Sequence, residues 1–377
     1  MPIKIAVDAR MLSRPLNGMG RYTLKTCSKL LKINGISLYL YSPAPLLVQY
    51  LSDLEGAFIK TSHINARLLQ HLWGETVLPS WAKKDKVDIF WGPSHRIPRL
   101  LSKDIPRVVT IHDLVWKYAR SSMPPNSYFL ERLQMPFAIN NSDHIVTVSQ
   151  ATAQSVNGEF SINPKRLTVT HLGAELHHTP DAFNSLHTLG IHSSYCLFVG
   201  TLEPRKNLSH LLSAYATLPD DHKQGKKLVI AGGDGWGNID LANLITRFHL
   251  EPHVILTGHV GEQTLATLYA HADFLVMPSI YEGFGLPLVE AMGYGTPVLT
   301  SNNSSMPEVA GDAGLFVDAE DIQSITDGLH QMISNTRLRD TLALNAKPNA
   351  SRFNWDDCAA QLYTVFMSVI SDRHNKR

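Results

Sequence analysis

Two glutamates eight residues apart enclose a glycine-rich run with the groups needed to hold a sugar and a ribose. Glu282 and Glu290 flank the run that begins Gly283-Phe284-Gly285-Leu286. An ionised carboxylate only accepts hydrogen bonds, so Glu282 suits sugar hydroxyls and Glu290 suits a ribose diol. The glycines let the backbone approach a ligand, and the helix expected after them offers free N–H groups to phosphate. The alternative is a capped helix with two solvated glutamates.

A pair of adjacent cations follows another glycine turn. Arg205 and Lys206 come shortly after Gly200, which itself ends an apolar run. The planar guanidinium of arginine can bind two oxygens at once, and the ammonium of lysine is a compact positive charge. Together they can neutralise a diphosphate leaving group. Fixed cations of this kind stabilise charge that grows in a transition state. The alternative is a solvated surface pair, which the position after a buried strand disfavours.

A histidine and a short glycine-containing segment complete the candidates. His112 follows the apolar run Val108–Ile111, where a neutral imidazole could donate to a sugar hydroxyl or orient a reacting centre. Gly18, Met19 and Gly20 are expected to form a loop near a ligand, but their spacing is not the GxGxxG dinucleotide fingerprint. The alternatives are a structural histidine, in a chain with 18 of them, and a plain turn.

No motif for a catalytic metal or for a serine nucleophile occurs. The chain has no Asp-x-Asp after a strand and no HExxH, and Cys27, Cys196 and Cys358 lack the spacing of metal ligands. The GxSxG elbow and the Walker A sequence are also absent. We therefore expect no metal and no cofactor.

These candidates need a scaffold that brings loops together, and the strand pattern predicts one. Apolar β-rich runs recur from Ile3–Asp8 to Leu167–His171, and again from Tyr195–Val199 to Pro297–Thr300, with helical segments between them. Strands that alternate with helices predict parallel sheets, whose ligands bind at the carboxyl ends of the strands. The expected fold class is α/β, with two Rossmann-like parallel-sheet domains facing across a cleft.

The domain boundaries follow from chain length and a change in composition. A chain of 377 residues suits two domains, and residues 174–192 lack clear periodicity and are interpreted as a linker. We predict an N-terminal domain over residues 1–180 and a C-terminal domain over residues 190–355. A helix is expected in the last segment, about 358–377.

Charge is distributed unevenly along the chain. Residues 1–180 carry 21 Lys and Arg against 12 Asp and Glu, a net charge of +9, whereas the whole chain is at +1. The basic half indicates an anionic partner, either a phospholipid surface or a lipid-pyrophosphate-linked acceptor; the alternative is a domain interface. With no signal peptide, no apolar run that could span a bilayer and scattered cysteines, the expected location is the cytoplasm.

Taken in order, the motifs resemble those of retaining family 4 glycosyltransferases with the GT-B fold. The run from Glu282 to Glu290 is similar to the E-x7-E motif of that family. GMGRYT together with IHD most resembles the branch that contains O-antigen mannosyltransferases. The matches cover essentially the whole chain: GMGRYT from Gly18, IHD from Ile111, TVSQATAQSV from Thr147, VGTLEPRKN from Val199, AGGDGW from Ala231, TGHV from Thr257 and MPEVAGDAG from Met306.

The resemblance implies that Arg205 and Lys206 hold the donor diphosphate, with the Gly18–Gly20 loop closing over it. Glu282 would bind the transferred sugar, assisted by the backbone amides of Phe284–Gly285. The family retains the anomeric configuration by a front-face displacement in which the donor phosphate takes the proton of the acceptor. It needs no divalent metal.

The resemblance also assigns the remaining candidates. Glu290 would bind the ribose, the backbone around Val260 would meet the nucleobase, and His112 would sit at the reacting centre. The first domain would bind the acceptor, and the last helix would pack back on that domain. Where relatives often show S-x-F-S, this chain has Ser149-Gln150-Ala151-Thr152, so Ser149 receives no role.

The expected function is transfer of a hexose from a nucleotide-sugar, with GDP-mannose the first choice and UDP-glucose the second. The acceptor would be a glycan or a lipid-linked oligosaccharide in surface polysaccharide synthesis, and the enzyme would make peripheral contact with an anionic membrane. No nucleic-acid partner is expected. The alternatives are a GT-B-fold nucleotide-sugar epimerase or phosphorylase and, outside enzymes, a nucleotide-sugar-binding protein.

Overall fold

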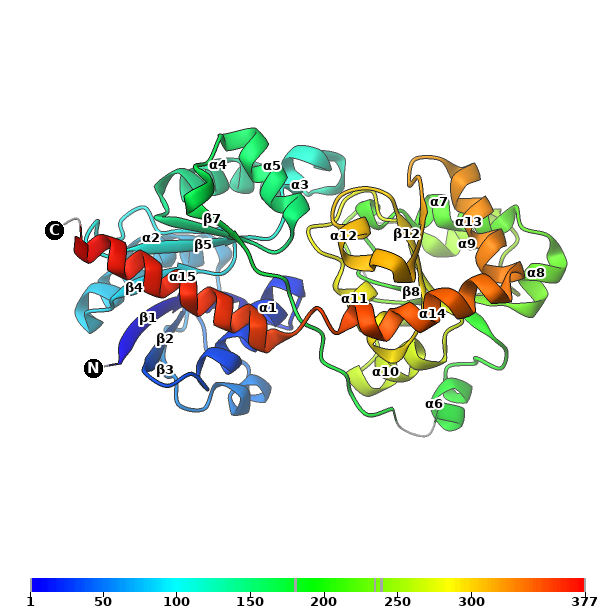
Figure 1. Ribbon diagram of the computed structural model, residues 1–377, viewed down its shortest axis with the longest axis horizontal. Helices are drawn as coiled ribbons and strands as arrows, with labels where there is room; N and C mark the ends of the chain where they lie inside the picture. Colours follow the sequence, from blue (N-terminus) through cyan, green and yellow to red (C-terminus); the bar gives the residue numbers. More distant parts are fainter. Residues whose placement is uncertain (1, 180–181, 234, 238–239, 376–377) are drawn as a thin grey trace. The chain divides into compact units, whose positions relative to one another are not determined.

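The computed structural model describes residues 2–179, 182–233, 235–237 and 240–375, which form two compact units (Figure 1). The first unit takes in Met1–Leu114, Phe129–Gly173 and Asn354–Arg377. The second takes in Val115–Tyr128 and Ala174–Phe353. Each unit is built on one parallel sheet, so the expected α/β class with two Rossmann-like domains is confirmed.

The first unit is built on a seven-stranded sheet in the order β3-β2-β1-β4-β5-β6-β7, with every neighbouring pair parallel. The order reverses direction between β1 and β4. At such a point the loops that follow the two strands lead to opposite faces of the sheet, and ligands bind in the crevice between those loops. The strands are β1 (Ile3–Asp8), β2 (Ile36–Ser42), β3 (Phe58–Thr61), β4 (Ile89–Gly92), β5 (Arg107–Ile111), β6 (His144–Thr147) and β7 (Leu167–Val169). The helices are α1 (Gly18–Leu30), α2 (Arg67–Asp85), α4 (Pro125–Asn141), α5 (Gln150–Phe160) and α15 (Trp355–Asn375).

The second unit is built on a six-stranded parallel sheet in the order β10-β9-β8-β11-β12-β13, and its direction reverses between β8 and β11. The strands are β8 (Tyr195–Val199), β9 (Lys227–Ala231), β10 (Val254–Gly258), β11 (Phe274–Met277), β12 (Val298–Ser301) and β13 (Gly314–Val317). The helices are α3 (Val115–Tyr118), α6 (Ala182–Thr188), α7 (Leu208–Ala216), α8 (Asp220–Gly225), α9 (Leu241–Arg247), α10 (Glu262–His271), α11 (Leu286–Tyr294), α12 (Met306–Ala310), α13 (Ile322–Ser334) and α14 (Thr336–Ala350).

Apolar strands covered on both faces make the cores of both units. Strand β8 is buried along its whole length, as expected for a parallel strand between two helix layers. In the second unit, Phe198 and Phe274 pack with Leu211, Leu212 and Tyr215 of α7 in one buried cluster. Within the described ranges, short 3-10 helices join these elements: η1 (Arg10–Ser13), η2 (Val48–Tyr50), η3 (Ser52–Leu54), η4 (Arg120–Ser122), η5 (Pro164–Arg166), η6 (Pro204–Lys206) and η7 (Gly311–Ala313).

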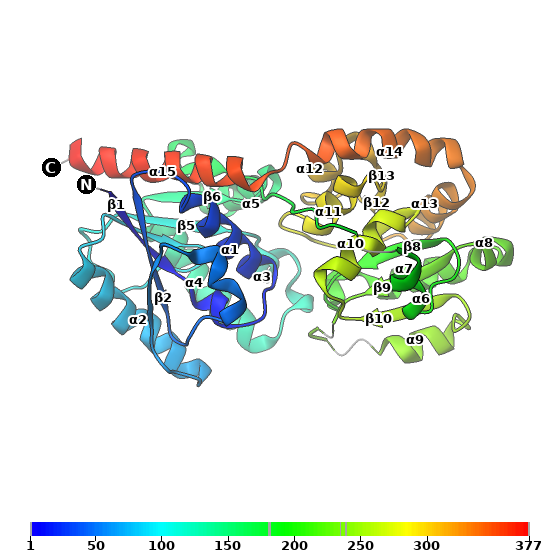
Figure 2. The same cartoon turned by 90° about the horizontal axis from the view of Figure 1, so that it is seen from below.

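The last helix, α15, belongs to the first unit, where it lies against α1 (Figures 1 and 2). Lys29 on α1 forms an ion pair with Asp356 at 2.7 Å, and the rings of Tyr22 and Trp355 lie 6.4 Å apart. A Cβ at Gly173 would overlap the backbone of Trp355. The absence of a side chain at Gly173 therefore lets the chain leave the first unit beside the start of α15.

Several elements differ from the sequence-based expectation. The prediction that Gly18, Met19 and Gly20 form a loop is wrong, because these residues form the first turn of α1. The Asn17 side chain accepts a hydrogen bond from the Gly20 amide at 2.9 Å and caps the helix there. The edge strands β3 and β13 and helix α6, inside the expected linker, were not foreseen. In the part of the chain that the structure describes, no helix has the length and apolarity to cross a membrane.

Gly92 offers a test of how tightly the first sheet is joined to the segment after β4. A Cβ at Gly92 would overlap the carbonyl oxygen of Arg96, whereas exposed Gly158 in α5 has open space around it. We expect Gly92→Ala to lower the free energy of unfolding by at least ~2 kcal/mol. Gly158→Ala should raise it by about 0.5–1 kcal/mol, because alanine favours the helix. Urea unfolding checks both, and equal midpoints for the two variants would contradict the packing at Gly92.

Candidate active site

An ion cluster lies at the carboxyl ends of β8 and β11 in the second unit. The carboxylate of Glu282 contacts the guanidinium of Arg205 at 2.7 Å and the ammonium of Lys206 at 2.6 Å. Glu282 and Lys206 are both buried, and Arg205 is partly exposed. The two cations follow β8 and the carboxylate follows β11, the two strands between which the sheet order reverses. The structure therefore brings these three predicted residues together at the end of the sheet where parallel α/β folds bind their ligands.

The backbone around Lys206 is held in place by its neighbours. Gly200 follows β8 with φ +156°, and a Cβ there would touch the Lys206 side chain at 3.4 Å, so the lysine lies against the glycine. Asn207 adopts a left-handed φ of 64° and donates hydrogen bonds to the carbonyls of Pro278 and Ala319, at 3.0 and 2.7 Å. These contacts fix the end of the 3-10 helix η6, which carries both cations.

The segment that carries Glu282 is tied to the cationic segment and to the chain after β12. The amide of Ile280 donates to the carbonyl of Arg205 at 2.8 Å. The Ser305 hydroxyl donates to the carbonyls of Glu282 and Phe284, at 3.0 and 2.9 Å. The amide of Glu282 in turn donates to the hydroxyl of Ser304. The position of the carboxylate is therefore set by contacts among three segments: its own after β11, the cationic segment after β8 and the segment after β12.

Helix α11 begins directly after this segment. Gly285 is its N-cap, with φ +98°, a conformation that glycine adopts without strain. A Cβ at Gly285 would also overlap the side chain of Met306. The ring of Phe284 is buried and packs edge-on against Phe353 at 5.5 Å. The helix that starts at Leu286 thus directs its first N–H groups toward the same end of the sheet as the ion cluster, where they favour an anion.

Burial and ion pairing pull the pKa values of the cluster in defined directions. Burial alone would raise the pKa of Glu282, but Arg205 and Lys206 outweigh it and lower that pKa to about 2. Burial lowers the pKa of Lys206, and the attraction of Glu282 offsets this only in part because Arg205 is also close. Glu282 is therefore a carboxylate at any physiological pH, and a further anion at this site would relieve the repulsion between the two cations.

Glu290 and Val260 lie on other elements of the second unit. Glu290 is buried on α11 and accepts a hydrogen bond from the Tyr269 hydroxyl of α10 at 2.8 Å. Val260 is half-buried, two residues beyond β10.

His112 lies in the first unit, directly after β5, and is buried. Its amide donates to Nε2 of His95 at 2.9 Å, and its carbonyl accepts from the hydroxyl of Thr152. Its own Nε2 lies 2.7 Å from the carbonyl of Pro93, so Nε2 carries the proton and Nδ1 the lone pair. Burial, followed by the charge of His95, lowers the pKa of His112 to about 3. The ring is neutral, and in this tautomer Nδ1 would accept a hydrogen bond rather than donate one.

Several positioning residues were missed by sequence reasoning. Asn207 and Ser305 anchor the ion cluster, and His95 anchors His112 and is itself hydrogen-bonded to Glu131. Ser149, which had no assigned role, caps α5 by accepting from the Thr152 amide. The only available signal was that Asn207 directly follows the Arg-Lys pair and that Ser305 directly precedes a recognised motif.

The cluster can bind a diphosphate and a sugar in adjacent places. The two cations provide a fork and a compact charge for phosphate oxygens, and the N-terminus of α11 adds backbone donors. Glu282 offers acceptors to sugar hydroxyls while it holds both cations. Among the described residues, no three His, Cys, Asp or Glu side chains gather in a group able to hold a metal ion.

Two family models match the chain, one in each half. Residues 16–178 match the model described as Glycosyltransferase Family 4, and residues 192–348 match the model described as Glycosyl transferases group 1. The first match lies in the chain that builds the first sheet, and the second includes the ion cluster and α11.

Proteins that match over nearly the whole chain carry related names. The O-antigen chain mannosyltransferase B of Escherichia coli is 30% identical, over 97% of this chain and 99% of its own length. The crystal structure of WaaG, a glycosyltransferase involved in lipopolysaccharide biosynthesis, matches with a TM-score of 0.75 at 16% identity, covering 97% of this chain and 99% of that one. Anabaena HepE in complex with UDP and glucose matches with a TM-score of 0.75 at 18% identity, covering 97% and 100%.

The stability of the second unit should depend on pH through Glu282. At neutral pH we expect Glu282→Gln to lower the free energy of unfolding by ~3 kcal/mol, because it leaves Lys206 buried without its carboxylate. The pKa of Glu282 falls from the ordinary 4.5 to about 2 on folding, so its stabilisation is present above pH 4.5 and is lost as pH falls toward 2. The difference in the free energy of unfolding between wild type and Glu282→Gln should therefore shrink as the pH falls from 4.5 to about 2.

Urea unfolding at a series of pH values measures this gap. Glu203→Gln is the matched control, because Glu203 contacts Arg205 at 2.9 Å but is 28% exposed, so its loss should cost much less. A gap that stays constant from pH 7 to pH 2 would contradict the ion-pair assignment of Glu282.

Proposed function

The chain belongs to family 4 of the glycosyltransferases, is of the O-antigen type and has the GT-B fold. From this membership we propose that it transfers a hexose with retention of anomeric configuration and without a metal ion. The proposed donor is GDP-mannose, with UDP-glucose second. The acceptor is a glycan or a lipid-linked oligosaccharide of surface polysaccharide synthesis.

The observation that carries this proposal is the ion cluster of Arg205, Lys206 and Glu282 at the point where the second sheet reverses direction. When a nucleotide-sugar reacts, negative charge grows on the departing diphosphate. Two cations held by fixed backbone contacts stabilise that charge without having to reorganise. The N-terminus of α11 adds backbone dipoles of the same sign.

The other predicted residues act in the proposed reaction as follows. Glu282 binds hydroxyls of the transferred sugar and Glu290 the ribose, while the backbone at Val260 meets the base. The neutral imidazole of His112, with its proton on Nε2, presents an acceptor at Nδ1 to a sugar hydroxyl. In a front-face displacement, the bond from the anomeric carbon to the diphosphate oxygen breaks as the acceptor oxygen bonds to the same face. The released diphosphate takes the acceptor's proton.

The choice of mannose rests on relatives rather than on a contact in this chain. The Escherichia coli relative that matches over nearly the full length is named as a mannosyltransferase, which supports mannose. HepE was solved with UDP and glucose, which supports the second choice. Assays with both nucleotide-sugars distinguish the two donors.

Turnover of variants tests the proposed function. We expect Lys206→Ala and Glu282→Ala each to lose at least about a hundredfold in kcat with GDP-mannose, close to ~2.7 kcal/mol of barrier. The wild-type reaction should proceed in excess EDTA and give product with the donor's anomeric configuration, followed by NMR. The matched control is Lys226→Ala, a lysine paired with Asp273 at the opposite, amino end of β9 and β11.

Four outcomes would contradict the proposal. Near-normal rates in folded Lys206→Ala and Glu282→Ala would remove the assigned roles. A strict requirement for magnesium would overturn metal independence. Conversion of donor without acceptor would indicate an epimerase, and binding without turnover of GDP-, UDP- or ADP-sugars would indicate a binding protein.

Peripheral contact with an anionic membrane is the remaining part of the proposal, and helix α2 supports it. Leu68, Leu69 and Leu72 in its first turns are 73%, 52% and 55% exposed, and Lys83 and Lys84 lie in its last turn. Exposed leucines on a helix of a basic half-chain suit the boundary of an anionic bilayer, where apolar burial and charge attraction add.

Vesicle sedimentation tests this contact. The wild-type chain should bind vesicles that contain anionic lipid more strongly than neutral vesicles. Leu68→Ser with Leu72→Ser should weaken binding by at least about tenfold, because burial of one leucine side chain contributes up to about 2 kcal/mol and a tenfold change in affinity is about 1.4 kcal/mol. Leu344→Ser is the matched control, a leucine 79% exposed on α14. Equal binding of both variants, or no preference for anionic lipid, would contradict the assignment of α2.

A further inference from the structure

A hydrogen bond between two buried side chains of the second unit orders the glutamate that is proposed to bind the ribose. The hydroxyl of Tyr269, on α10, donates to Oε2 of Glu290, on α11, at 2.8 Å. Tyr269 is 2% exposed and Glu290 is 8% exposed. A hydrogen bond to a carboxylate is roughly twice as strong as one between neutral groups. The contact therefore fixes one oxygen of this carboxylate.

The place of Glu290 on its helix makes such a contact useful. Glu290 is the fifth residue of α11, about 6 Å along the helix axis from Leu286, where the helix begins. Glutamate is among the side chains that lose most rotamer freedom when they are held in one conformation. A ligand binds more tightly to a carboxylate that is already ordered, because binding then does not have to order it.

Tyr269 is itself held by its neighbours. The hydroxyl of Thr296 donates to the carbonyl of Tyr269 at 2.6 Å, and the amide of Thr296 donates to the carbonyl of Ala291 on α11 at 3.1 Å. The ring of Tyr269 stacks on the ring of Tyr294, with centroids 6.2 Å apart and planes 13° from parallel. The Tyr294 hydroxyl accepts from the amide of His177 at 2.7 Å and donates to the carbonyl of the same residue at 3.0 Å. Both the backbone and the ring of Tyr269 are thus in place before a ligand binds.

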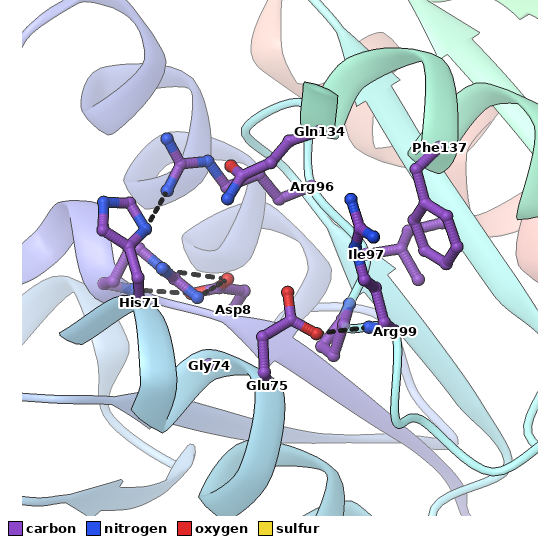
Figure 3. A pocket seen from close by; sticks show the side chains of 11 residues that line it. Asp8, His71, Gly74, Glu75, Arg96, Ile97, Arg99, Gln134 and Phe137 are labelled. Carbon is purple, nitrogen blue, oxygen red and sulfur yellow. Dashed lines mark hydrogen bonds and ion pairs between the residues drawn. The ribbon is translucent and has the colours of Figure 1, made fainter. Parts of the chain in front are cut away.

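A tyrosine hydroxyl orders a carboxylate without adding a positive charge to it, whereas a guanidinium neutralises it. The first unit shows the second case, in a polar pocket lined by Asp8, Arg10 and Arg96 where its sheet reverses direction (Figure 3). Both oxygens of Asp8 accept from Nε of Arg10 there, at 2.8 and 2.9 Å. The bond from Tyr269 fixes Glu290 without such an ion pair, so it leaves the negative charge available to attract hydroxyls of a ligand.

The geometry of a ribose matches a fixed carboxylate. A ribose presents two neighbouring hydroxyls and a carboxylate presents two oxygens, so one ordered carboxylate can accept from both hydroxyls at once. A carboxylate that rotates meets the two hydroxyls in the correct orientation for only part of the time. A site built to accept from hydroxyls discriminates against an analogue that lacks them. The orientation of the carboxylate therefore sets how strongly the site selects a ribose.

We propose that Tyr269 is a positioning residue for the donor. It holds Glu290 so that the carboxylate accepts from both ribose hydroxyls, and it thereby sets the selectivity of the site for ribonucleotides. Thr296 and Tyr294 keep Tyr269 in place and, like it, do not contact the donor. This assignment rests on the proposed transfer from a nucleotide-sugar, in which Glu290 binds the ribose, and it adds the residue that orders Glu290.

Nucleotide binding, measured by calorimetry on the full chain, tests the assignment. The probes are GDP and UDP, each compared with its 2′,3′-dideoxy analogue, and the comparison uses the nucleotide that the wild type binds more tightly. Tyr269→Phe should weaken binding of the ribonucleotide by about fivefold to tenfold, the cost of ordering one long side chain on binding. It should leave binding of the dideoxy analogue unchanged, which also shows that the variant is folded.

A double-mutant cycle shows whether Tyr269 acts through Glu290. Glu290→Ala should remove most of the difference in affinity between the ribonucleotide and the dideoxy analogue. Tyr269→Phe added to Glu290→Ala should weaken binding no further, because the side chain that it positions is already gone.

Two further tyrosines provide matched controls. Tyr294→Phe keeps the stacked ring and loses only the hydroxyl that contacts His177. Tyr215→Phe loses a hydroxyl that donates to the carbonyl of Lys226 at 2.6 Å, at the amino end of β9. Both variants should keep the wild-type ratio of the two dissociation constants, that of the dideoxy analogue to that of the ribonucleotide.

The outcomes separate the role of Tyr269 from the proposed function. Equal weakening of both nucleotides in Tyr269→Phe, or no weakening of the ribonucleotide, would overturn the positioning role while the proposed function stands. A further loss in the Glu290→Ala background would overturn it as well, since Tyr269 would then act elsewhere. The same change of ratio in Tyr294→Phe would indicate a general loosening of α10 against α11 and would also overturn it. Failure of the wild type to bind either GDP or UDP would overturn the proposed function and, with it, this assignment.

Discussion

The buried carboxylate of Glu282 between Arg205 and Lys206 is the interaction on which the second unit's chemistry depends. A lysine taken out of water is unstable without a partner, and two adjacent cations repel each other. The Glu282 carboxylate lies 2.7 Å from the Arg205 guanidinium and 2.6 Å from the Lys206 ammonium, so it pairs with the buried lysine and offsets the repulsion between the two cations. It remains ionised because its pKa is lowered to about 2. In the proposed reaction, both cations are therefore already in place before a diphosphate binds. Preorganisation of this kind is what makes fixed charge effective in a transition state.

The surrounding structure holds that carboxylate against its neighbours rather than leaving it on a mobile loop. Asn207 joins the cationic segment to the chain after β11, and Ser305 supports two carbonyls of the segment that carries Glu282. Gly285 allows α11 to begin immediately afterwards. Asn207 and Ser305 contact no ligand in the proposed reaction, yet they determine where the charged atoms lie. Their loss would move the cluster without changing its composition.

The first unit follows the same design with different chemistry. Its sheet also reverses direction at its centre, and polar residues gather where the carboxyl ends of β1 and β4 diverge. The series Arg96–Glu131–His95, in which His95 is buried and the other two are half-buried, links that pocket to the backbone of His112. Burial keeps His112 neutral, and the contact with Pro93 selects its tautomer. Each parallel sheet of this chain thus has polar residues gathered at its reversal point.

The sequence by itself determined the alternation of strands and helices, the family, and the fact that Arg205, Lys206, Glu282 and His112 follow strands. These features depend on local patterns, since strand length, apolar runs and glycine turns can be recognised within a few residues. Only the tertiary structure decided that β8 lies beside β11, which brings residues more than seventy positions apart into one ion cluster. It also decided that Arg10, Arg96 and Gln134 line one pocket. The helix that begins at Gly18 was missed although its signal, the cap by the Asn17 side chain, is local. Pairing in a parallel sheet is non-local, so the choice of neighbour depends on packing that no single segment encodes.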